Sequence, residues 1–76
     1  MEDISVDVKI AILTQKLQIF KNSSYDALID AKVAKILENE NNEKQATDRL
    51  ANITKAIDFI EKELLALEEE PPEQED

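Results

Sequence analysis

The fold is decided by residues 46–67, which read ATDRLANITKAIDFIEKELLAL. Apolar side chains recur in this stretch at alternating spacings of four and three residues. This period places them on one face of a helix, as in the seam of a coiled coil or an antiparallel helical hairpin. We therefore predict a long helix over residues 42–69. Its seam consists of Ala46, Leu50, Ile53, Ile57, Ile60, Leu64 and Leu67.

A first helix is predicted upstream, over residues 5–21. Its stripe has the same alternating spacing, and Asp3 or Ser5 could cap its start. The stripe is Val6, Ile10, Leu13, Leu17 and Phe20, and we expect Val8, Ile12 and Ile19 to widen it.

A second helix is predicted over residues 24–39. Asn22, Ser23 and Ser24 interrupt the apolar pattern at its start, because Ser and Asn favour turns and N-caps over helix interiors. Its large apolar residues are Tyr25, Leu28, Ile29, Val33, Ile36 and Leu37, beside a stripe of Ala27, Ala31 and Ala34. An Asn-rich break over residues 38–42 then leads into the long helix, with Asn42 as its cap. One continuous rod over residues 24–69 remains the alternative.

The composition supports an all-α fold in one domain, residues 1–69. Gly is absent, and the two prolines of the 76 residues lie near the C-terminal end, so tight hairpins and phosphate-binding loops are disfavoured. No Cys or His is present, which excludes disulfides and thiolate or imidazole metal sites. We expect no cofactor, no metal and no catalysis. Serines without a His to activate them are explained by capping.

The predicted helix lengths imply self-association. In an up-down-up three-helix bundle, helices of 16 or 17 residues would cover only part of the long one. Ile60, Leu64, Leu65 and Leu67 would then protrude by roughly 15 Å and need a second chain to cover them. We therefore expect a homo-oligomer.

Charge gives limited information on partners. The net charge is −9, but six of the 18 acidic residues fall within residues 68–76. Residues 1–67 then carry 12 acidic against 9 basic residues, so the acidity belongs mainly to a tail, predicted to be mobile over residues 70–76. Nucleic-acid binding, which needs a basic face, is disfavoured. With no apolar run of membrane-spanning length and no basic leader, we expect a soluble cytoplasmic protein.

Six further residues are candidates for contact with a ligand or partner. The register gathers the three aromatic residues at one end of the bundle, and four basic residues could together hold an anion. These candidates are Tyr25, Phe59, Lys32, Lys35, Arg49 and Lys55, with Phe20 as the third aromatic residue. A core plug and scattered solubilising charge are the simpler interpretations.

The motif Asp-Ala-x-x-x-Ala-Lys-Val-Ala-Lys (residues 26–35) is followed by a long Ile/Leu heptad helix, and this combination resembles the sequences of one class of small helical proteins. Small helical accessory proteins of bacteriophages and prophages have this compactness and this Lys-, Asn-, Ile- and Glu-rich composition. The resemblance covers residues 10–67 and assigns no functional residue. It implies a role in the host cytoplasm, such as blocking a host enzyme or defence protein.

The leading hypothesis is a non-catalytic, homo-oligomeric helical adaptor or inhibitor that binds another protein. One alternative is an oligomeric sponge that holds a small anionic signalling ligand between subunits. Another is an acidic decoy for a DNA-binding enzyme, which would require the tail.

Overall fold

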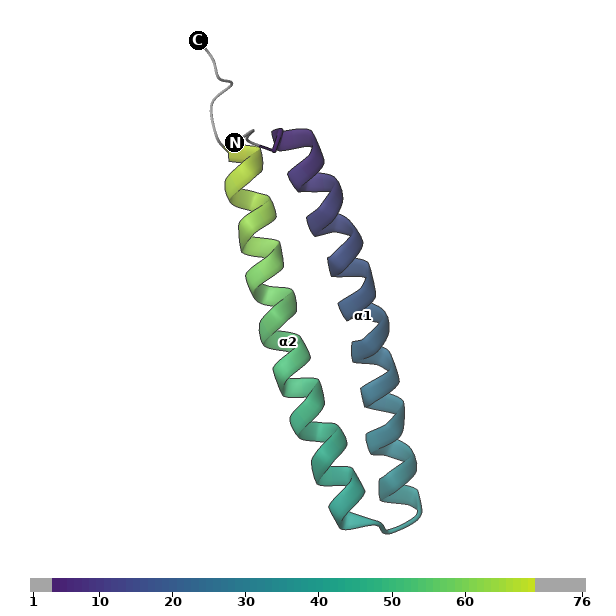
Figure 1. Ribbon diagram of the computed structural model, residues 1–76. Coiled ribbons are helices and arrows are strands. Elements are labelled where there is room, and N and C mark those ends of the chain that lie inside the picture. Colours follow the sequence, from purple (N-terminus) through teal and green to yellow (C-terminus); the bar gives the residue numbers. More distant parts are fainter. Residues whose placement is uncertain (1–3, 70–76) are drawn as a thin grey trace.

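The protein is an antiparallel hairpin of two long helices (Figure 1). The structure is a computed structural model that describes residues 4–69. Helix α1 spans Val6–Ile36 and helix α2 spans Glu40–Glu69. No strand occurs in this part of the chain, which confirms the all-α prediction. The predicted acidic tail, residues 70–76, and the candidate cap Asp3 lie outside the described residues.

The three-helix bundle is wrong, because the predicted first and second helices are one helix. Residues 22–24 continue α1 without interruption. The local preferences of Ser and Asn for turns are weak compared with tertiary packing, which stabilises a helix whose apolar seam is continuous. Ser24 occupies a seam position, four residues after Phe20 and three before Ala27, so a straight helix keeps the pattern in phase.

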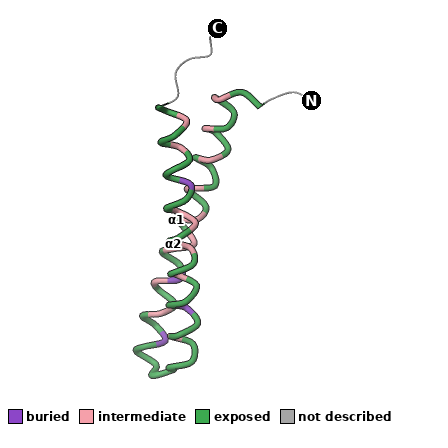
Figure 2. Tube along the Cα trace, turned by 90° about the vertical axis from the view of Figure 1, so that its left-hand side faces the viewer, coloured by how far each residue is buried: buried purple, intermediate pink, exposed green. Residues whose placement is uncertain are grey.

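The seam of α1 therefore extends along the whole helix. Each of its side chains is buried or half-buried, while nearly all the others on α1 are exposed (Figure 2). The spacing alternates between four and three residues throughout, which is the heptad repeat of a coiled coil. The seam residues are Val6, Ile10, Leu13, Leu17, Phe20, Ser24, Ala27, Ala31 and Ala34.

Small side chains form the seam near the turn, where the predicted stripe of Ala27, Ala31 and Ala34 faces α2. Ala27 is completely buried, and Ala34 and Ala46 are nearly so. The large apolar residues of the predicted second helix are exposed, except for the half-buried Leu28. Small side chains let two helix backbones approach closely, so alanine contact takes the place of a bulky core.

The predicted seam of α2 is confirmed from Ala46 to Leu67. Ala46 and Ile60 are buried, and the other seam residues are half-buried. However, the predicted overhang is wrong, because α1 has 31 residues and α2 has 30. At 1.5 Å per residue each helix is about 45 Å long, so α1 covers the entire seam of α2. The hairpin also excludes the continuous rod.

Capping bonds define the ends of the helices around the turn. The Asn39 N–H donates to the Ala34 carbonyl and the Glu38 N–H to the Lys35 carbonyl, which is a Schellman C-cap. Asn39 then caps α2 in place of the predicted Asn42, because its Oδ1 accepts the Asn42 N–H at 3.1 Å. At the other end of α1, Ser5 is confirmed as the N-cap, since its Oγ accepts the Val8 N–H.

Glu38 adopts a left-handed backbone conformation with φ of 58°. This conformation is unfavourable for a residue with a Cβ atom and costs glycine little. We expect Glu38→Gly to raise the free energy of unfolding by about 0.5–1 kcal/mol, measured by urea denaturation. The matched control is Glu40→Gly, which places glycine in the first turn of α2 and should be neutral or destabilising. Destabilisation by Glu38→Gly would contradict the assignment of strain to this residue.

Candidate interaction surface

A second apolar stripe runs along α1 on the side opposite the seam. Its positions again alternate by four and three residues, and six of the nine are apolar and exposed. We call these nine positions the outer stripe. They are Val8, Ile12, Gln15, Ile19, Asn22, Asp26, Ile29, Val33 and Ile36.

The outer stripe corrects the sequence interpretation of α1. Val8, Ile12 and Ile19 do not widen the packed face as predicted but point away from α2, because their helical phase is opposite to that of the seam. The signal is present in part in the sequence, since six of the nine positions of this second spacing pattern between residues 8 and 36 are apolar. It is recognisable only when residues 22–24 are taken as helical.

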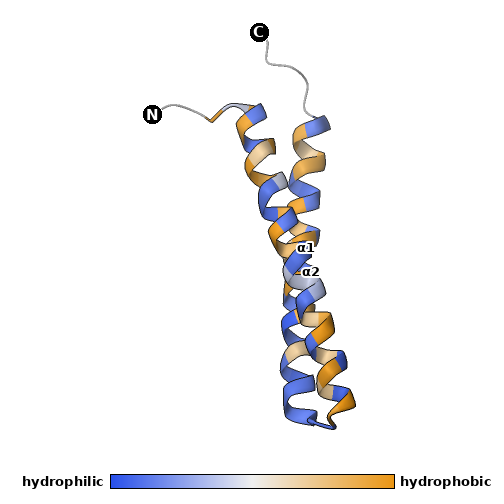
Figure 3. Cartoon of the chain, turned by 90° about the vertical axis from the view of Figure 1, so that its right-hand side faces the viewer, coloured by the Kyte–Doolittle hydropathy of each residue, from blue (hydrophilic) through white to orange (hydrophobic). Residues whose placement is uncertain are grey.

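Apolar residues of the outer stripe form two groups with a polar centre. Figure 3, which faces the α1 side, shows hydrophobic patches near the turn and towards the N-terminal end. Between them lie Gln15, Asn22 and Asp26; the Asn22 side chain accepts a hydrogen bond from the Gln18 amide at 2.9 Å. Exposure is greatest near the turn, where Ile36 is 78% exposed. Side chains of this size, aligned on one helix face, are characteristic of a surface that binds another helix.

The outward face of α2 is different in character. It carries mainly polar and charged residues, including the ion pairs Lys44–Asp48 (3.1 Å) and Lys62–Asp58 (3.2 Å). Its exposed large apolar residues are Phe59 and Leu65, which differ by six positions and so point in different directions. Helix α2 therefore has one apolar face, whereas α1 has two.

The residues predicted for self-association lie mostly inside the hairpin. Ile60 is buried, and Leu64 and Leu67 are half-buried, all on the seam facing α1. Leu65 alone is exposed, at 54%. Ile60, Leu64 and Leu67 do not need a second chain to cover them, because α1 already lies against them.

The predicted basic group is spread over the hairpin. Arg49 bridges the two helices, since its Nη2 lies 2.8 Å from Asp30 Oδ2 and 3.6 Å from Asp26 Oδ2. These two carboxylates balance the charge of Arg49 and help to fix the register of the helices. Lys32, Lys35 and Lys55 are exposed, with Lys55 on the outward side of α2, so the four do not converge on one point.

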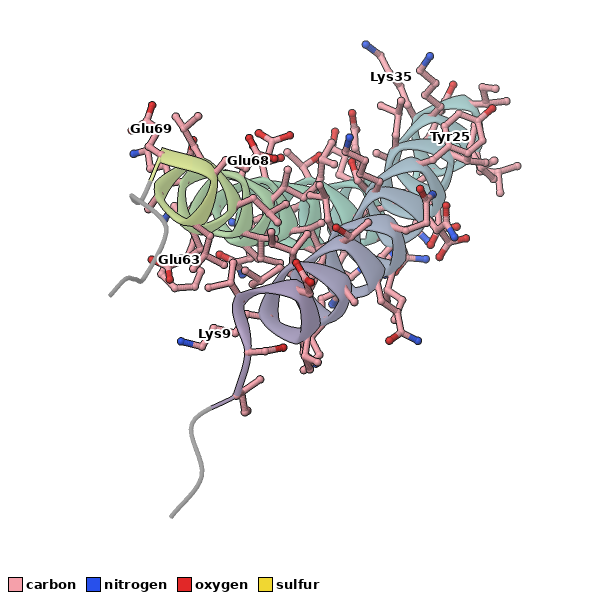
Figure 4. All side chains as sticks on the ribbon, turned by 90° about the horizontal axis from the view of Figure 1, so that it is seen from above. Lys9, Tyr25, Lys35, Glu63, Glu68 and Glu69 are labelled. Atoms are coloured by element: carbon pink, nitrogen blue, oxygen red, sulfur yellow. The ribbon has the colours of Figure 1, made fainter. Side chains whose placement is uncertain are left out.

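The predicted aromatic cluster is also dispersed. Phe20 is half-buried in the seam, whereas Tyr25 is 65% exposed and Phe59 is 60% exposed. Figure 4, viewed along the hairpin, shows Tyr25 and Lys35 projecting outward from α1. Phe59 comes from the other helix, so the aromatic rings form neither a core plug nor a pocket wall.

A hollow of about 270 Å³ lies beside the turn. It is lined by both helices and includes the Arg49–Asp30 ion pair. The hollow is partly open to solvent, and the two charged residues in its lining, Asp30 and Arg49, are already paired with each other. Side-chain amides from Asn39, Asn42 and Gln45 complete its polar rim.

Within residues 4–69, no group of three carboxylates lies close enough together to hold a metal ion. Neither of the helices in this range is long and apolar enough to cross a membrane. Comparison with known protein families, with curated proteins and with solved structures found no match for this chain.

Proposed function

We propose that this chain is a non-catalytic protein-interaction module that associates with helical partners, including its own copies, through the outer stripe of α1. The supporting observation is that six large apolar side chains lie exposed on one face of a helix whose other face is already packed. Fully burying such a side chain contributes about 1.5–3 kcal/mol. An apolar helix placed along this stripe would supply that burial.

The partner that fits the outer stripe is itself an amphipathic helix. Side chains that repeat every seven residues match the heptad repeat of another helix, and a stripe about 40 Å long suits several turns of it. The resemblance to phage accessory proteins implies an adaptor or inhibitor that blocks a host protein. Such a protein would use this surface to bind a helix of its target. The outer stripe then takes the role proposed earlier for residues 60–67.

The two alternative functions have less support. A sponge for an anionic ligand would need cationic groups with free charge, yet Arg49 is engaged by Asp26 and Asp30. An acidic decoy would depend on the charge carried by residues 70–76, outside the described range. Neither explains the outer stripe.

The experiment that tests this proposal removes apolar surface without adding charge. We expect the unmodified chain to dimerise in sedimentation equilibrium, and Ile29→Gln/Val33→Gln to weaken the dissociation constant at least about 100-fold. Each dimer would bury four fewer apolar side chains, at roughly 1 kcal/mol each because they are already partly covered. Helicity by circular dichroism should remain, since these side chains point away from α2.

The matched control is Phe59→Gln/Leu65→Gln, which removes two exposed apolar residues from α2. We expect it to leave the dissociation constant within about threefold, a difference of less than 1 kcal/mol. An unmodified chain that stays monomeric up to about 1 mM would contradict self-association. Equal weakening by both double substitutions would contradict the assignment to the outer stripe.

A further inference from the structure

We infer that, in the self-association proposed above, α1 packs antiparallel against α1 of a second copy, with Ile12 facing Ile36 and Ile19 facing Ile29. This inference rests on the proposed function and adds the partner, the orientation and the register. Tyr25 of each copy then lies beside the twofold axis.

The outer stripe is self-complementary when one copy is reversed. With residue 24 at the midpoint, Ile12 lies opposite Ile36 and Ile19 opposite Ile29, and the twofold axis repeats both contacts. An isologous interface requires this property, because each half of the stripe must match the other half. The four apolar contacts use isoleucine alone, and Ile36 is the most exposed of the large apolar residues.

Polar residues of the outer stripe also match in this register. Asn22 of one copy faces Asp26 of the other, so an amide donor lies opposite a carboxylate acceptor. A polar contact of this kind within an apolar helix interface specifies the register, because the one-heptad shift described below would place Asn22 against Ile19. Gln15 faces Val33 near each end, where solvent remains accessible.

Charges beside the stripe favour the antiparallel orientation. Lys16 and Asp30 lie on the same flank of the stripe, so Lys16 of one copy comes near Asp30 of the other, two positions from the directly opposite residue. This contact of opposite charge occurs twice and adds to the Arg49–Asp30 pair within each copy. In a parallel pair with both copies in register, Asp26 would instead face Asp26 at the centre of the interface. Two carboxylates that face each other in an apolar contact are unfavourable even though each lies 3.6 Å from Arg49 of its own copy, so the parallel arrangement is disfavoured on electrostatic grounds.

A shift by one heptad gives the closest competing register. Ile12 would then face Ile29, Val8 would face Val33, and Ile19 would face Asn22. Ile36 would extend beyond the apolar part of the second helix. The shifted register replaces two isoleucine contacts with two valine contacts, so it buries less apolar surface.

Single cysteines distinguish these registers because the chain contains no other cysteine. We expect Tyr25→Cys to form a covalent dimer readily under mild oxidation or with a short bismaleimide. The matched control is Phe59→Cys, a similarly exposed aromatic position on α2, which should cross-link at least about tenfold more slowly because thiols joined by a disulfide need Cα atoms within about 7 Å. Mixing Ile12→Cys chains with Ile36→Cys chains should give the mixed dimer in preference to either homodimer.

Several outcomes would overturn the inference. Rapid cross-linking of Ile19→Cys without Tyr25→Cys would indicate the shifted register, and homodimers of Ile36→Cys would indicate parallel helices. Sedimentation of the same samples in reducing buffer distinguishes an incorrect register from the absence of self-association. A reversible dimer that fails to cross-link at Tyr25 overturns the register alone, whereas a monomer in reducing buffer overturns self-association itself.

Discussion

Ile60→Ala should lower the free energy of unfolding by about 2–3 kcal/mol and the melting temperature by about 8–20 °C. Ile60 is 5% exposed and is the largest buried side chain of the described seam. Truncation removes its buried methyl groups and leaves a space that a two-helix hairpin can only partly close. A chain of 76 residues has about 4–11 kcal/mol of stability in total, so this loss is a large fraction.

The matched control for Ile60→Ala is Leu65→Ala in the same helix. Leu65 is 54% exposed, so its truncation should cost less than about 1 kcal/mol. Urea unfolding followed by circular dichroism, repeated at two protein concentrations, separates hairpin stability from association. Similar losses for both substitutions would show that Ile60 is not held against α1.

Ala27→Leu should destabilise the hairpin by about 1–3 kcal/mol, although leucine is the more hydrophobic residue. Ala27 has no exposed surface and lies where the two helices meet through small side chains. Added methyl groups would have to push α2 away or take up strained rotamers. The expected fall in melting temperature is about 4–20 °C.

Ala11→Leu is the control for Ala27→Leu, because it makes the same replacement at an exposed position of the same helix. Alanine and leucine have similar helix propensities, so a change within about 0.5 kcal/mol is expected. Thermal unfolding by circular dichroism compares the two directly. A more stable Ala27→Leu variant would mean that space exists between the helices near the turn, contrary to the close packing described.

Much of the fold could be predicted from the sequence, and the errors share a physical cause. The seam of α2 and the cap at Ser5 were predictable because each depends on residues close together in the chain. The break at residues 22–24 was wrongly predicted because local propensities of Ser and Asn were weighted above the continuity of a heptad. That continuity depends on Ala27 being a core residue, and alanine gives almost no hydrophobic signal.

The position of the proposed interaction surface could not be predicted for the same reason. A helix interrupted at Ser23 has no long outer stripe. Its two halves would also be too short to cover the predicted helix over residues 42–69, and this difference in length pointed to Leu64 and Leu67 as the exposed surface. Once α1 is continuous, the mismatch disappears and the unburied surface lies on α1. Burial of Ala27 and exposure of Ile29 follow from which face of α1 meets α2, and that depends on contacts between residues far apart in the chain, such as Arg49–Asp30, 19 residues apart.

Because α2 has a single apolar face, many of its other positions should tolerate substitution. Its outward positions neither pack against α1 nor belong to the outer stripe, and surface replacements of this kind usually change stability by less than about 0.5 kcal/mol. Helix α1, which has an apolar stripe on each of two faces, offers fewer such positions. Asn52 and Lys55 are exposed on α2, so a fluorophore or an affinity handle attached there would leave both apolar faces intact.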